Sequence, residues 1–316
     1  IEREEVPLEN IEVNEGISEE SQEIMKNYTT IALFGLDNRS NGNLSKGRSD
    51  VIMIANINND TKEVKLCSVF RDSYLDTGDG SFKKCNAAYA KGGPEAAINM
   101  LNKNLDLSIT DYVTVDFNAV VECVDLLGGI TLDEVTDEEA VLMQGYMDEI
   151  NKLTKNNSKY LSGGGTNVQL DGVQACAYAR IRYTKGDDYK RAERQRTVLA
   201  AMVAKAQKSD LVTINKLIDA VFGDIQTSFS NTDLVALAAQ VFNYKLGESS
   251  GFPFSKNSTT LGSKGSVVVP CTLESNVIEL HQFLFGDEEY TPSDTVLANS
   301  KKIISDTGMN EGSGYR

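Results

Sequence analysis

The sequence has 316 residues and is poor in several residue types on which whole classes of function depend. It contains one histidine, His281, and no tryptophan. A Ser-His-Asp triad would therefore depend on that single residue, and a zinc site built from several histidines is excluded. No stretch of 18 apolar residues occurs, so this sequence predicts no membrane span.

Cysteine and proline are also scarce, with five of each. The cysteines show no C-x-x-C spacing, which argues against a zinc cluster or a thioredoxin-type motif. Their odd number leaves at least one thiol outside any disulfide within the chain. Cys67 and Cys176 lie in apolar runs, where we expect small core residues. One or two disulfides stay an open alternative for an exported protein.

Positive charge is in deficit, because 31 Lys and Arg stand against 46 Asp and Glu, a net charge of −15. We expect no nucleic-acid partner, since DNA binding depends on a basic face that neutralises phosphates. The chain begins with Ile rather than Met and shows no signal peptide. We expect it to be trimmed from a longer precursor.

Hydrophobic patterning predicts both strands and helices. Runs that are apolar on both faces predict buried central strands at 30–36, 51–57, 64–70 and 112–117, and a short strand follows at 266–269. Amphipathic patterns predict helices at 94–104, 118–127, 136–155, 170–179, 190–208, 210–222, 231–246 and 273–285. This mixture predicts a layered α/β or α+β sandwich.

The chain is expected to have three segments. Residues 1–27 form an acidic N-terminal linker with a short helix, and residues 28–286 form one domain, because no boundary interrupts their elements. Residues 287–316 form a C-terminal helix and a loose tail. Inside the domain we expect a loop at 157–169 and an extended segment at 178–183.

The arginines are the most informative feature. Five of the ten lie within 180–196, and none lies in 72–179 or 197–315. In an extended segment Arg180 and Arg182 share one face, and on the next helix Arg191, Arg194 and Gln195 share another. Arginine grips phosphates and carboxylates through a planar fork, so the cluster indicates an anion site. The alternative is a solvated helix with Glu193, Asp187 and Asp188 as ion-pair partners.

Two further groups of charges lie at strand ends, where α/β sheets collect ligands. Asp37 follows one buried strand and Asp50 precedes the next, and their carboxylates would suit Mg²⁺ and a phosphate substrate. Ordinary turn chemistry is the alternative. Arg71 and Asp72 follow a third strand, where a ligand or a local Arg–Asp pair would satisfy their charges.

Eight segments in order resemble the LytR–CpsA–Psr family of bacterial envelope proteins, within residues 29–208. They are Gly35–Arg39, Gly47–Asp50, Ser68–Asp72, Lys84–Asn86 with Ala88-Tyr89 and Gly92-Gly93, Val124–Gly129, Leu170–Ala175, Tyr178–Arg182 and Asp188–Gln195. The resemblance implies a three-layer α-β-α sandwich around a mixed central sheet. It also implies an N-terminal membrane anchor, absent from this sequence, and a catalytic domain on the extracytoplasmic face of the cell membrane.

The resemblance implies an enzyme, a Mg²⁺-dependent phosphotransferase of cell-wall biogenesis, with Mn²⁺ as the alternative ion. It would move a glycopolymer, such as a teichoic acid or capsule, from a polyprenyl-diphosphate carrier to a peptidoglycan hydroxyl and release polyprenyl phosphate. Asp37 and Asp50 become candidate metal ligands. The candidate catalytic residues are Arg71, Arg180, Arg182 and Asp50. The candidate substrate-binding residues are Arg48, Arg71, Arg180, Arg182, Arg191, Arg194 and Gln195.

Two other functions stay open. The same residues could pass the phosphoryl group to water, as in a polyprenyl-diphosphate phosphatase or pyrophosphatase, or the protein could be a non-catalytic lipid-binding envelope regulator. For the lipid itself we expect an apolar channel that ends at Arg180 and Arg182, with the helix at 195–206 as one wall.

Overall fold

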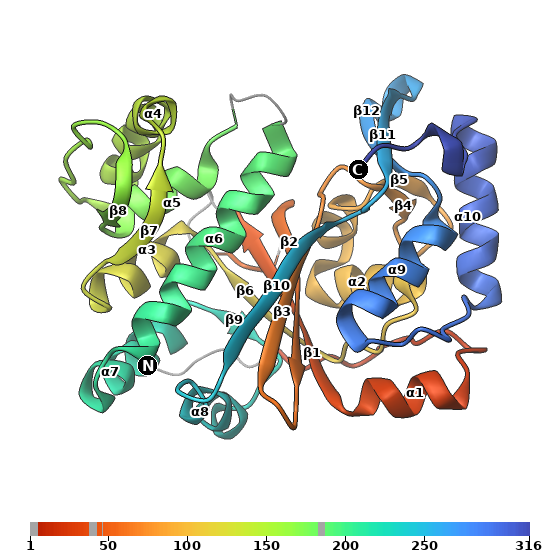
Figure 1. Ribbon diagram of the computed structural model, residues 1–316, viewed down its shortest axis with the longest axis horizontal. Helices are drawn as coiled ribbons and strands as arrows, with labels where there is room; N and C mark the ends of the chain where they lie inside the picture. The colour runs from red at the N-terminus through yellow and green to blue at the C-terminus, as the bar shows by residue number, and fades with distance from the viewer. Residues whose placement is uncertain (1–5, 38–42, 46, 183–186) are drawn as a thin grey trace. The chain divides into compact units, whose positions relative to one another are not determined.

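The structure, a computed structural model, describes residues 6–37, 43–45, 47–182 and 187–316 (Figure 1). They form two compact units, and each is described by itself. We call 6–114 with 245–316 the sheet unit, and 115–244 the helical unit. The single domain expected over 28–286 stays a prediction, because compact units of one chain need not be separate domains.

The sheet unit is built on a mixed sheet. The strands of the unit, in this sheet and in two smaller ones, are β1 (Tyr28–Leu36), β2 (Ser49–Asn58), β3 (Glu63–Val69), β4 (Tyr74–Asp76), β5 (Phe82–Lys84), β6 (Asp111–Val115), β10 (Lys245–Phe252), β11 (Lys256–Thr260) and β12 (Ser266–Pro270). In the main sheet they follow the order β10-β3-β2-β1-β6. β1, β2 and β3 are antiparallel, whereas β10 is parallel to β3. β4–β5 and β11–β12 form separate antiparallel pairs.

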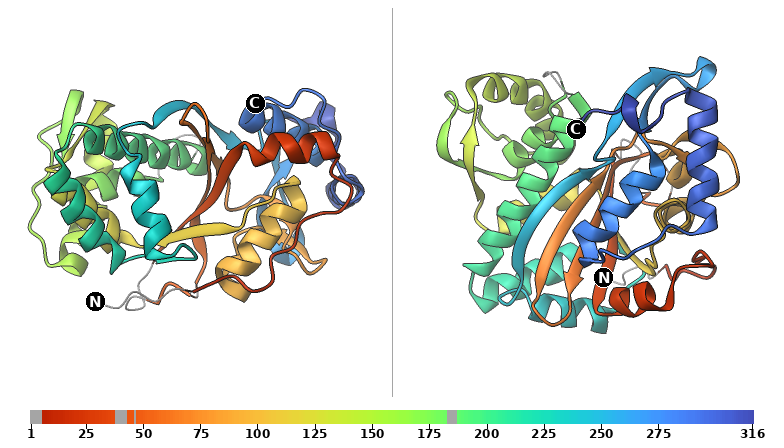
Figure 2. Two further views of the ribbon diagram at one scale, coloured as in Figure 1. Left: turned by 90° about the horizontal axis from the view of Figure 1, so that it is seen from below. Right: turned by 45° about the vertical axis from the view of Figure 1, so that its right-hand side comes forward.

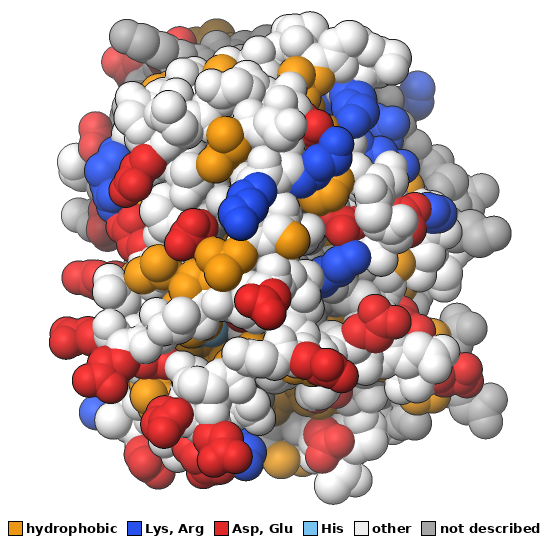
Figure 3. All heavy atoms as spheres, turned by 90° about the vertical axis from the view of Figure 1, so that its right-hand side faces the viewer, with side chains coloured by type: hydrophobic (Ala, Val, Ile, Leu, Met, Phe, Trp, Pro, Cys, Tyr) orange, Lys and Arg blue, Asp and Glu red, His pale blue; other side chains and the backbone are white. Residues whose placement is uncertain are grey.

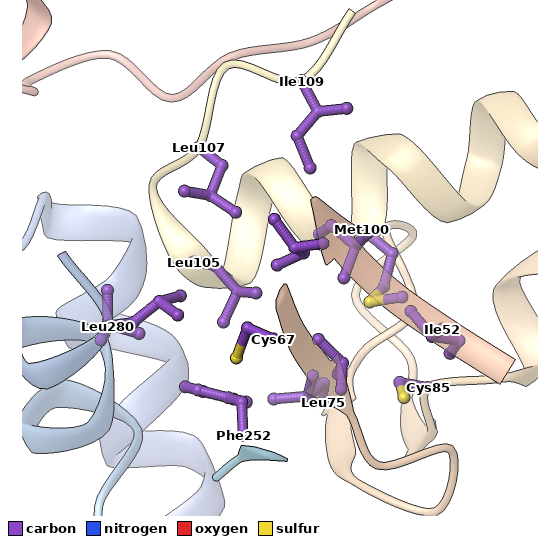
Figure 4. Packing of buried hydrophobic residues seen from close by; sticks show 14 of the residues in the cluster. Ile52, Cys67, Leu75, Cys85, Met100, Leu105, Leu107, Ile109, Phe252 and Leu280 are labelled. Carbon is purple, nitrogen blue, oxygen red and sulfur yellow. The ribbon is translucent and has the colours of Figure 1, made fainter. Parts of the chain in front are cut away.

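Helices pack against this sheet and bury its core. They are α1 (Glu19–Lys26), α2 (Ala87–Leu105), α9 (Leu273–Phe285) and α10 (Asp294–Thr307), with 3-10 turns at Gly262–Lys264 and Glu311–Ser313. Alternate strand residues such as Phe34, Ile52 and Cys67 join α2 and α9 residues such as Leu105 and Leu280 in one buried cluster (Figure 4). Figure 2 shows α9 beside the strands from a second direction.

The first turns of α2 were not expected from the sequence, which predicts a helix only from Pro94. The helix begins at Ala87 and kinks at Gly92 and Gly93, where Gly93 has a φ of 70°. Proline lacks an N–H and restricts the residue before it, so the glycines absorb the change of direction. A Cβ on Gly93 would also lie 3.1 Å from the Ser45 carbonyl oxygen, a close approach that favours glycine.

The helical unit packs several helices around α5. Its elements are α3 (Phe117–Leu126), β7 (Ile130–Val135), α4 (Asp137–Thr154), β8 (Gly165–Leu170), α5 (Gly172–Arg180), α6 (Asp187–Gln207), α7 (Leu211–Phe222), β9 (Gln226–Thr227) and α8 (Asn231–Ala239). α5 lies against α3, α4 and α6, and buries Val173 and Cys176 in the core of the unit. At its start a Cβ on Gly172 would lie 2.2 Å from the Val121 carbonyl oxygen, so only glycine fits.

The fold class is confirmed as α/β, with helices around a mixed central sheet. The four apolar runs are strands β1, β2, β3 and β6, and Cys67 and Cys176 are buried as predicted. His281 is fully buried and stacks on Tyr290 with ring centroids 3.7 Å apart, which is a packing role. No helix among the described residues is long and apolar enough to cross a membrane.

Four expectations were wrong. Residues 178–180 are not extended but form the last turn of α5, whose capping box at Asp171 and Gln174 starts the helix. The loop at 157–169 contains most of β8, which pairs with β7. The helix at 231–246 ends at Ala239, and Lys245 already belongs to β10. The C-terminal tail within 287–316 is not loose, because Tyr315 exchanges two backbone hydrogen bonds with Lys256.

Candidate functional site

The sheet unit brings Asp37 and Asp50 to one end of neighbouring strands. β1 ends where β2 begins, because the strands are antiparallel and Leu36 pairs with Ser49. Asp37 directly follows the first strand, and Asp50 lies beside the register shift at Gly35 and Leu36. A Cβ on Gly35 would lie 2.8 Å from Val51, so this glycine allows the close approach of the strands. Both aspartates are half-buried.

Arg71 joins them from the end of β3. Its Nη1 donates to Asp50 Oδ1 at 2.6 Å, and the two side chains are 15% and 28% exposed. The Arg71 carbonyl oxygen accepts from the Cys85 thiol at 3.4 Å and the Asn86 N–H at 3.1 Å. Burial, with a smaller contribution from Asp72, raises the pKa of the Cys85 thiol. The thiol therefore stays protonated and fixes the backbone that carries Arg71.

Other charged residues of the sheet unit lie near the ends of its strands. Asp72 pairs with Lys84 at 3.6 Å, and Arg48 lies exposed before β2. Lys256, which sequence reasoning missed, is 8% exposed, and its Nζ lies 5.6 Å from the centroid of the Phe70 ring. Burial, and then the cationic Arg316, lower the pKa of Lys256. No sequence pattern singles it out, because β11 is a short polar strand.

In the helical unit Arg180 is the last residue of α5 and is held by three side chains. Its Nη2 lies 3.3 Å from Glu149 Oε2. Its Cζ lies 4.3 Å from the centroid of the Phe117 ring and 5.2 Å from that of Tyr146. The guanidinium thus lies over two aromatic rings and beside an acid, contacts that limit its movement.

Arg182 and Arg191 share one carboxylate. Asp188 Oδ1 lies 3.8 Å from Arg182 Nε and 3.3 Å from Arg191 Nη2. The Arg182 side chain is 47% exposed and that of Arg191 only 9%. The predicted alternative, a helix whose arginines pair with neighbouring acids, therefore holds in part, because Asp188 pairs with Arg182 and Arg191. The two guanidinium groups therefore lie beside the same carboxylate.

Arg194 and Gln195 instead bind the protein itself. Arg194 Nε donates to Glu139 Oε2 at 2.7 Å and Nη1 donates to the Ile181 carbonyl oxygen at 3.3 Å. Gln195 Nε2 donates to the Ala179 carbonyl oxygen at 3.5 Å. Burial works to raise the pKa of Glu139, but the Thr136 N–H and Arg194 together hold that pKa below its usual value. These contacts tie the end of α5 to α4 and α6.

The sheet end that carries Asp37 and Asp50 has carboxylate ligands for a divalent cation. No three His, Cys, Asp or Glu side chains gather into a metal-holding group in the described part of the chain. Asp37 and Asp50 offer carboxylate oxygens, the ligand type that Mg²⁺ prefers. Mg²⁺ keeps waters and substrate phosphates in its other positions, so the two residues fit an ion that a phosphorylated substrate helps to bind.

A cavity of about 570 Å³ opens in the helical unit, and none of the candidate site residues lines it. Its lining comes from α3 and the end of α4, namely Asn118, Val121, Glu122, Asp125, Leu126, Leu153, Thr154, Lys155 and Asn156. A hydrogen bond with Asp224, supported by burial and charge repulsion, raises the pKa of Glu122 to about 7. The sequence does not predict this raised pKa, because Glu122 is an exposed helix residue and its partner Asp224 is distant in the chain.

The structure therefore groups the predicted residues within each unit. Asp37 and Asp50 lie at one sheet end, where Asp50 pairs with Arg71, and Arg182 and Arg191 both lie beside Asp188. The predicted convergence of Arg71 with Arg180 and Arg182 joins two units and stays a prediction. Asn38 and Arg39 of the family-like segment at 35–39, and Tyr183 of the predicted extended segment at 178–183, lie outside the described residues.

Curated relatives match the chain over about two thirds of its length. A polyisoprenyl-teichoic acid–peptidoglycan teichoic acid transferase, TagU of Enterococcus faecalis, is 32% identical over 212 residues, 66% of this chain and 64% of the relative. The corresponding TagV of Bacillus subtilis is 31% identical over 226 residues, 70% of this chain and 53% of the relative. The match thus spans less than two thirds of either relative's length.

Similarity also extends to solved structures and to a family model. The crystal structure of protein gbs0355 from Streptococcus agalactiae superposes with a TM-score of 0.69 at 23% identity, covering 88% of this chain and 92% of that one, and shows the same fold. The model of the LytR_cpsA_psr family matches residues 6–255. Because this match covers well over half of the sequence, the chain belongs to the LytR_cpsA_psr family.

Proposed function

We propose that this protein transfers a glycopolymer from a polyprenyl-diphosphate carrier to a hydroxyl of peptidoglycan on the extracytoplasmic face of the cell membrane. The two relatives above carry names that describe transfer of teichoic acid to peptidoglycan. The structural observation that supports the proposal most is the Arg71–Asp50 pair at 2.6 Å, at the sheet end where Asp37 also lies. It combines a phosphate-binding fork with two carboxylates.

The reaction can be written with these residues. The acceptor hydroxyl oxygen attacks the phosphorus that bears the glycan, and the bond from that phosphorus to the bridging oxygen breaks. Polyprenyl phosphate leaves with the bridging oxygen, and the hydroxyl proton passes to a carboxylate, Asp50 or Asp37. Phosphoryl transfer needs in-line positioning and charge neutralisation more than covalent help, so no histidine is required.

The arginines supply the charge neutralisation. Arg71, Arg180 and Arg182 would bind the diphosphate oxygens, because guanidinium forks match phosphate geometry. Arg48 and Arg191 would extend this set, whereas Arg194 and Gln195 would position it through their internal contacts. Since most of these groups are already held by protein partners, they need little reorganisation when charge develops.

Mg²⁺ would be held by Asp37 and Asp50, and when bound it would neutralise charge on the diphosphate. Mn²⁺ is the alternative ion. For the polyprenyl chain, the apolar channel with a wall at 195–206 of α6 stays part of this proposal. Burial of each methylene stabilises the bound lipid by about 0.8 kcal/mol, which favours an enclosed path over an exposed one.

The test is an assay of the purified protein with a glycan linked to polyprenyl diphosphate, with and without peptidoglycan. We expect release of polyprenyl phosphate together with glycopolymer on peptidoglycan, and little release without the acceptor. Equal release in both reactions would replace the proposal with a polyprenyl-diphosphate phosphatase. Lipid binding with no release in either reaction would replace it with a non-catalytic lipid-binding envelope regulator.

A further inference from the structure

We propose that Phe117 and Tyr146 are positioning residues that hold the Arg180 guanidinium in the plane from which it binds the donor diphosphate. Neither residue belongs to the segments that carry the family resemblance. The inference rests on the proposed function, because it requires Arg180 to bind a diphosphate. All the groups involved lie in the helical unit.

Three elements meet at this guanidinium. Arg180 ends α5, Phe117 begins α3, and Tyr146 and Glu149 lie one turn apart on α4. The ring centroids lie 4.3 and 5.2 Å from Arg180 Cζ, within the range of a cation–π contact. The two rings therefore restrain the position of the guanidinium. Glu149, at 3.3 Å from Nη2, restrains one edge.

The exposure of the acid separates this pair from a purely structural ion pair. In the Arg194–Glu139 pair both side chains are buried, at 6% and 12% exposed. In the Arg180–Glu149 pair the arginine is 11% exposed but the glutamate is 37% exposed. A partner that reaches solvent can be exchanged for an incoming anion at low cost, while the rings keep the guanidinium in place.

Preorganisation is the physical benefit. An arginine side chain has many rotamers, and binding a ligand normally costs the freedom that is lost. Contact with the two rings removes part of that freedom before the ligand arrives, so the fork needs less ordering to meet the phosphate oxygens. Leucine at 117 or 146 would preserve apolar packing but remove the flat π face.

The experiment measures transfer and binding in Tyr146→Leu, Tyr146→Phe and Phe117→Leu, each with and without Arg180→Lys. We expect each leucine variant to lower kcat/KM for transfer, and affinity for geranyl diphosphate by calorimetry, roughly five- to thirtyfold, as loss of a desolvated cation–π contact implies. Tyr146→Phe keeps the ring and should restore most of both values. In the Arg180→Lys background the leucine variants should change kcat/KM and the affinity for geranyl diphosphate less than about twofold.

Tyr160→Leu is the matched control, because Tyr160 belongs to the same unit and is 48% exposed. It should leave transfer unchanged, and thermal unfolding should show that every compared variant is folded. The inference is overturned if Arg180→Lys impairs transfer but the leucine variants do not, or if their effects multiply with that of Arg180→Lys. If Arg180→Lys itself has no effect, the proposed role of Arg180 in the function fails instead.

Discussion

Arg71 and Arg194 show that one residue type has two tasks in this molecule. The Arg71 fork pairs with Asp50 at a strand end and stays 15% exposed, whereas Arg194 is 6% exposed and bound to Glu139 and a carbonyl oxygen. In the sequence, Arg71 and Arg194 are both candidate substrate-binding residues. The contacts distinguish a partly exposed arginine at a strand end from a buried one that holds helices together.

Arg71→Lys should lower transfer activity by roughly ten- to hundredfold, because an ammonium group cannot reproduce the two-point grip of a guanidinium fork. The measurement is initial rates with the glycan-linked lipid at saturating acceptor. Arg316→Lys is the control, since that exposed arginine pairs with Glu279. Equal rates for Arg71→Lys and the unmodified protein would remove Arg71 from the site.

Arg194→Leu should destabilise the protein by about 3 kcal/mol, because it leaves the largely buried Glu139 carboxylate without this partner. Urea unfolding measures the change in the free energy of unfolding. Lys190→Leu is the control, because the Lys190–Glu193 pair is exposed and such pairs contribute less than about 1 kcal/mol. Similar losses in both variants would contradict the structural role assigned to Arg194.

At the scale of elements, α3 and α7 meet through two acids. Glu122 lies on α3, and Asp224 follows the end of α7. Their hydrogen bond requires a shared proton, which raises the pKa of Glu122 to about 7 from a usual value of 4.5. The folded state therefore binds this proton more tightly than the unfolded state does, and the contact between the two helices depends on pH.

The sign of this effect gives a prediction. A raised carboxyl pKa contributes stability that is fully present below about pH 4.5 and is lost as the pH rises through about 7. We expect the unfolding free energy of Glu122→Gln to vary less with pH in this window than that of the unmodified protein. Urea titrations at several pH values measure it, with the exposed Glu138→Gln as the control. Parallel pH profiles would contradict the shared proton.

Element boundaries also show where local patterns fail. β10 is a polar, glycine-containing strand, KLGESSGF, with no alternation of apolar residues. It is a strand because β3 offers a parallel edge, with Phe252 paired to Val69, and because Gly251 leaves room for the Phe70 ring, which a Cβ would approach to 2.4 Å. Such an element depends on a partner distant in sequence, so the pattern alone cannot predict it.

At the scale of the whole molecule, negative charge exceeds positive charge. Acidic side chains are scattered over the face shown in Figure 3, as a net charge of −15 predicts. A diphosphate would be repelled by such a surface unless cations gather locally. We expect the arginines within each unit, and a divalent ion at Asp37 and Asp50, to supply such positive charge.

Removal of divalent cations tests whether a metal ion helps to neutralise the charge of the diphosphate. We expect chelator treatment to lower transfer by roughly two orders of magnitude and added Mg²⁺ to restore it, because charge on the diphosphate is otherwise incompletely neutralised. The transfer rate of Asp37→Ala should stay low at every Mg²⁺ concentration. That of Asp60→Ala, at an exposed position, should depend on Mg²⁺ concentration as the rate of the unmodified protein does. Wild-type turnover by Asp37→Ala in chelator-treated buffer would exclude Asp37 as a metal ligand.

The sequence by itself determined the fold class, the family and most of the buried strands, because apolar runs, capping residues and ordered motifs are local properties of the chain. It also singled out Asp37, Asp50 and Arg71. Only the tertiary structure decided that Arg71 pairs with Asp50, that α5 extends through Arg180, and that aromatic rings hold this guanidinium. These features depend on register and on packing between distant segments, which one-dimensional spacing does not encode.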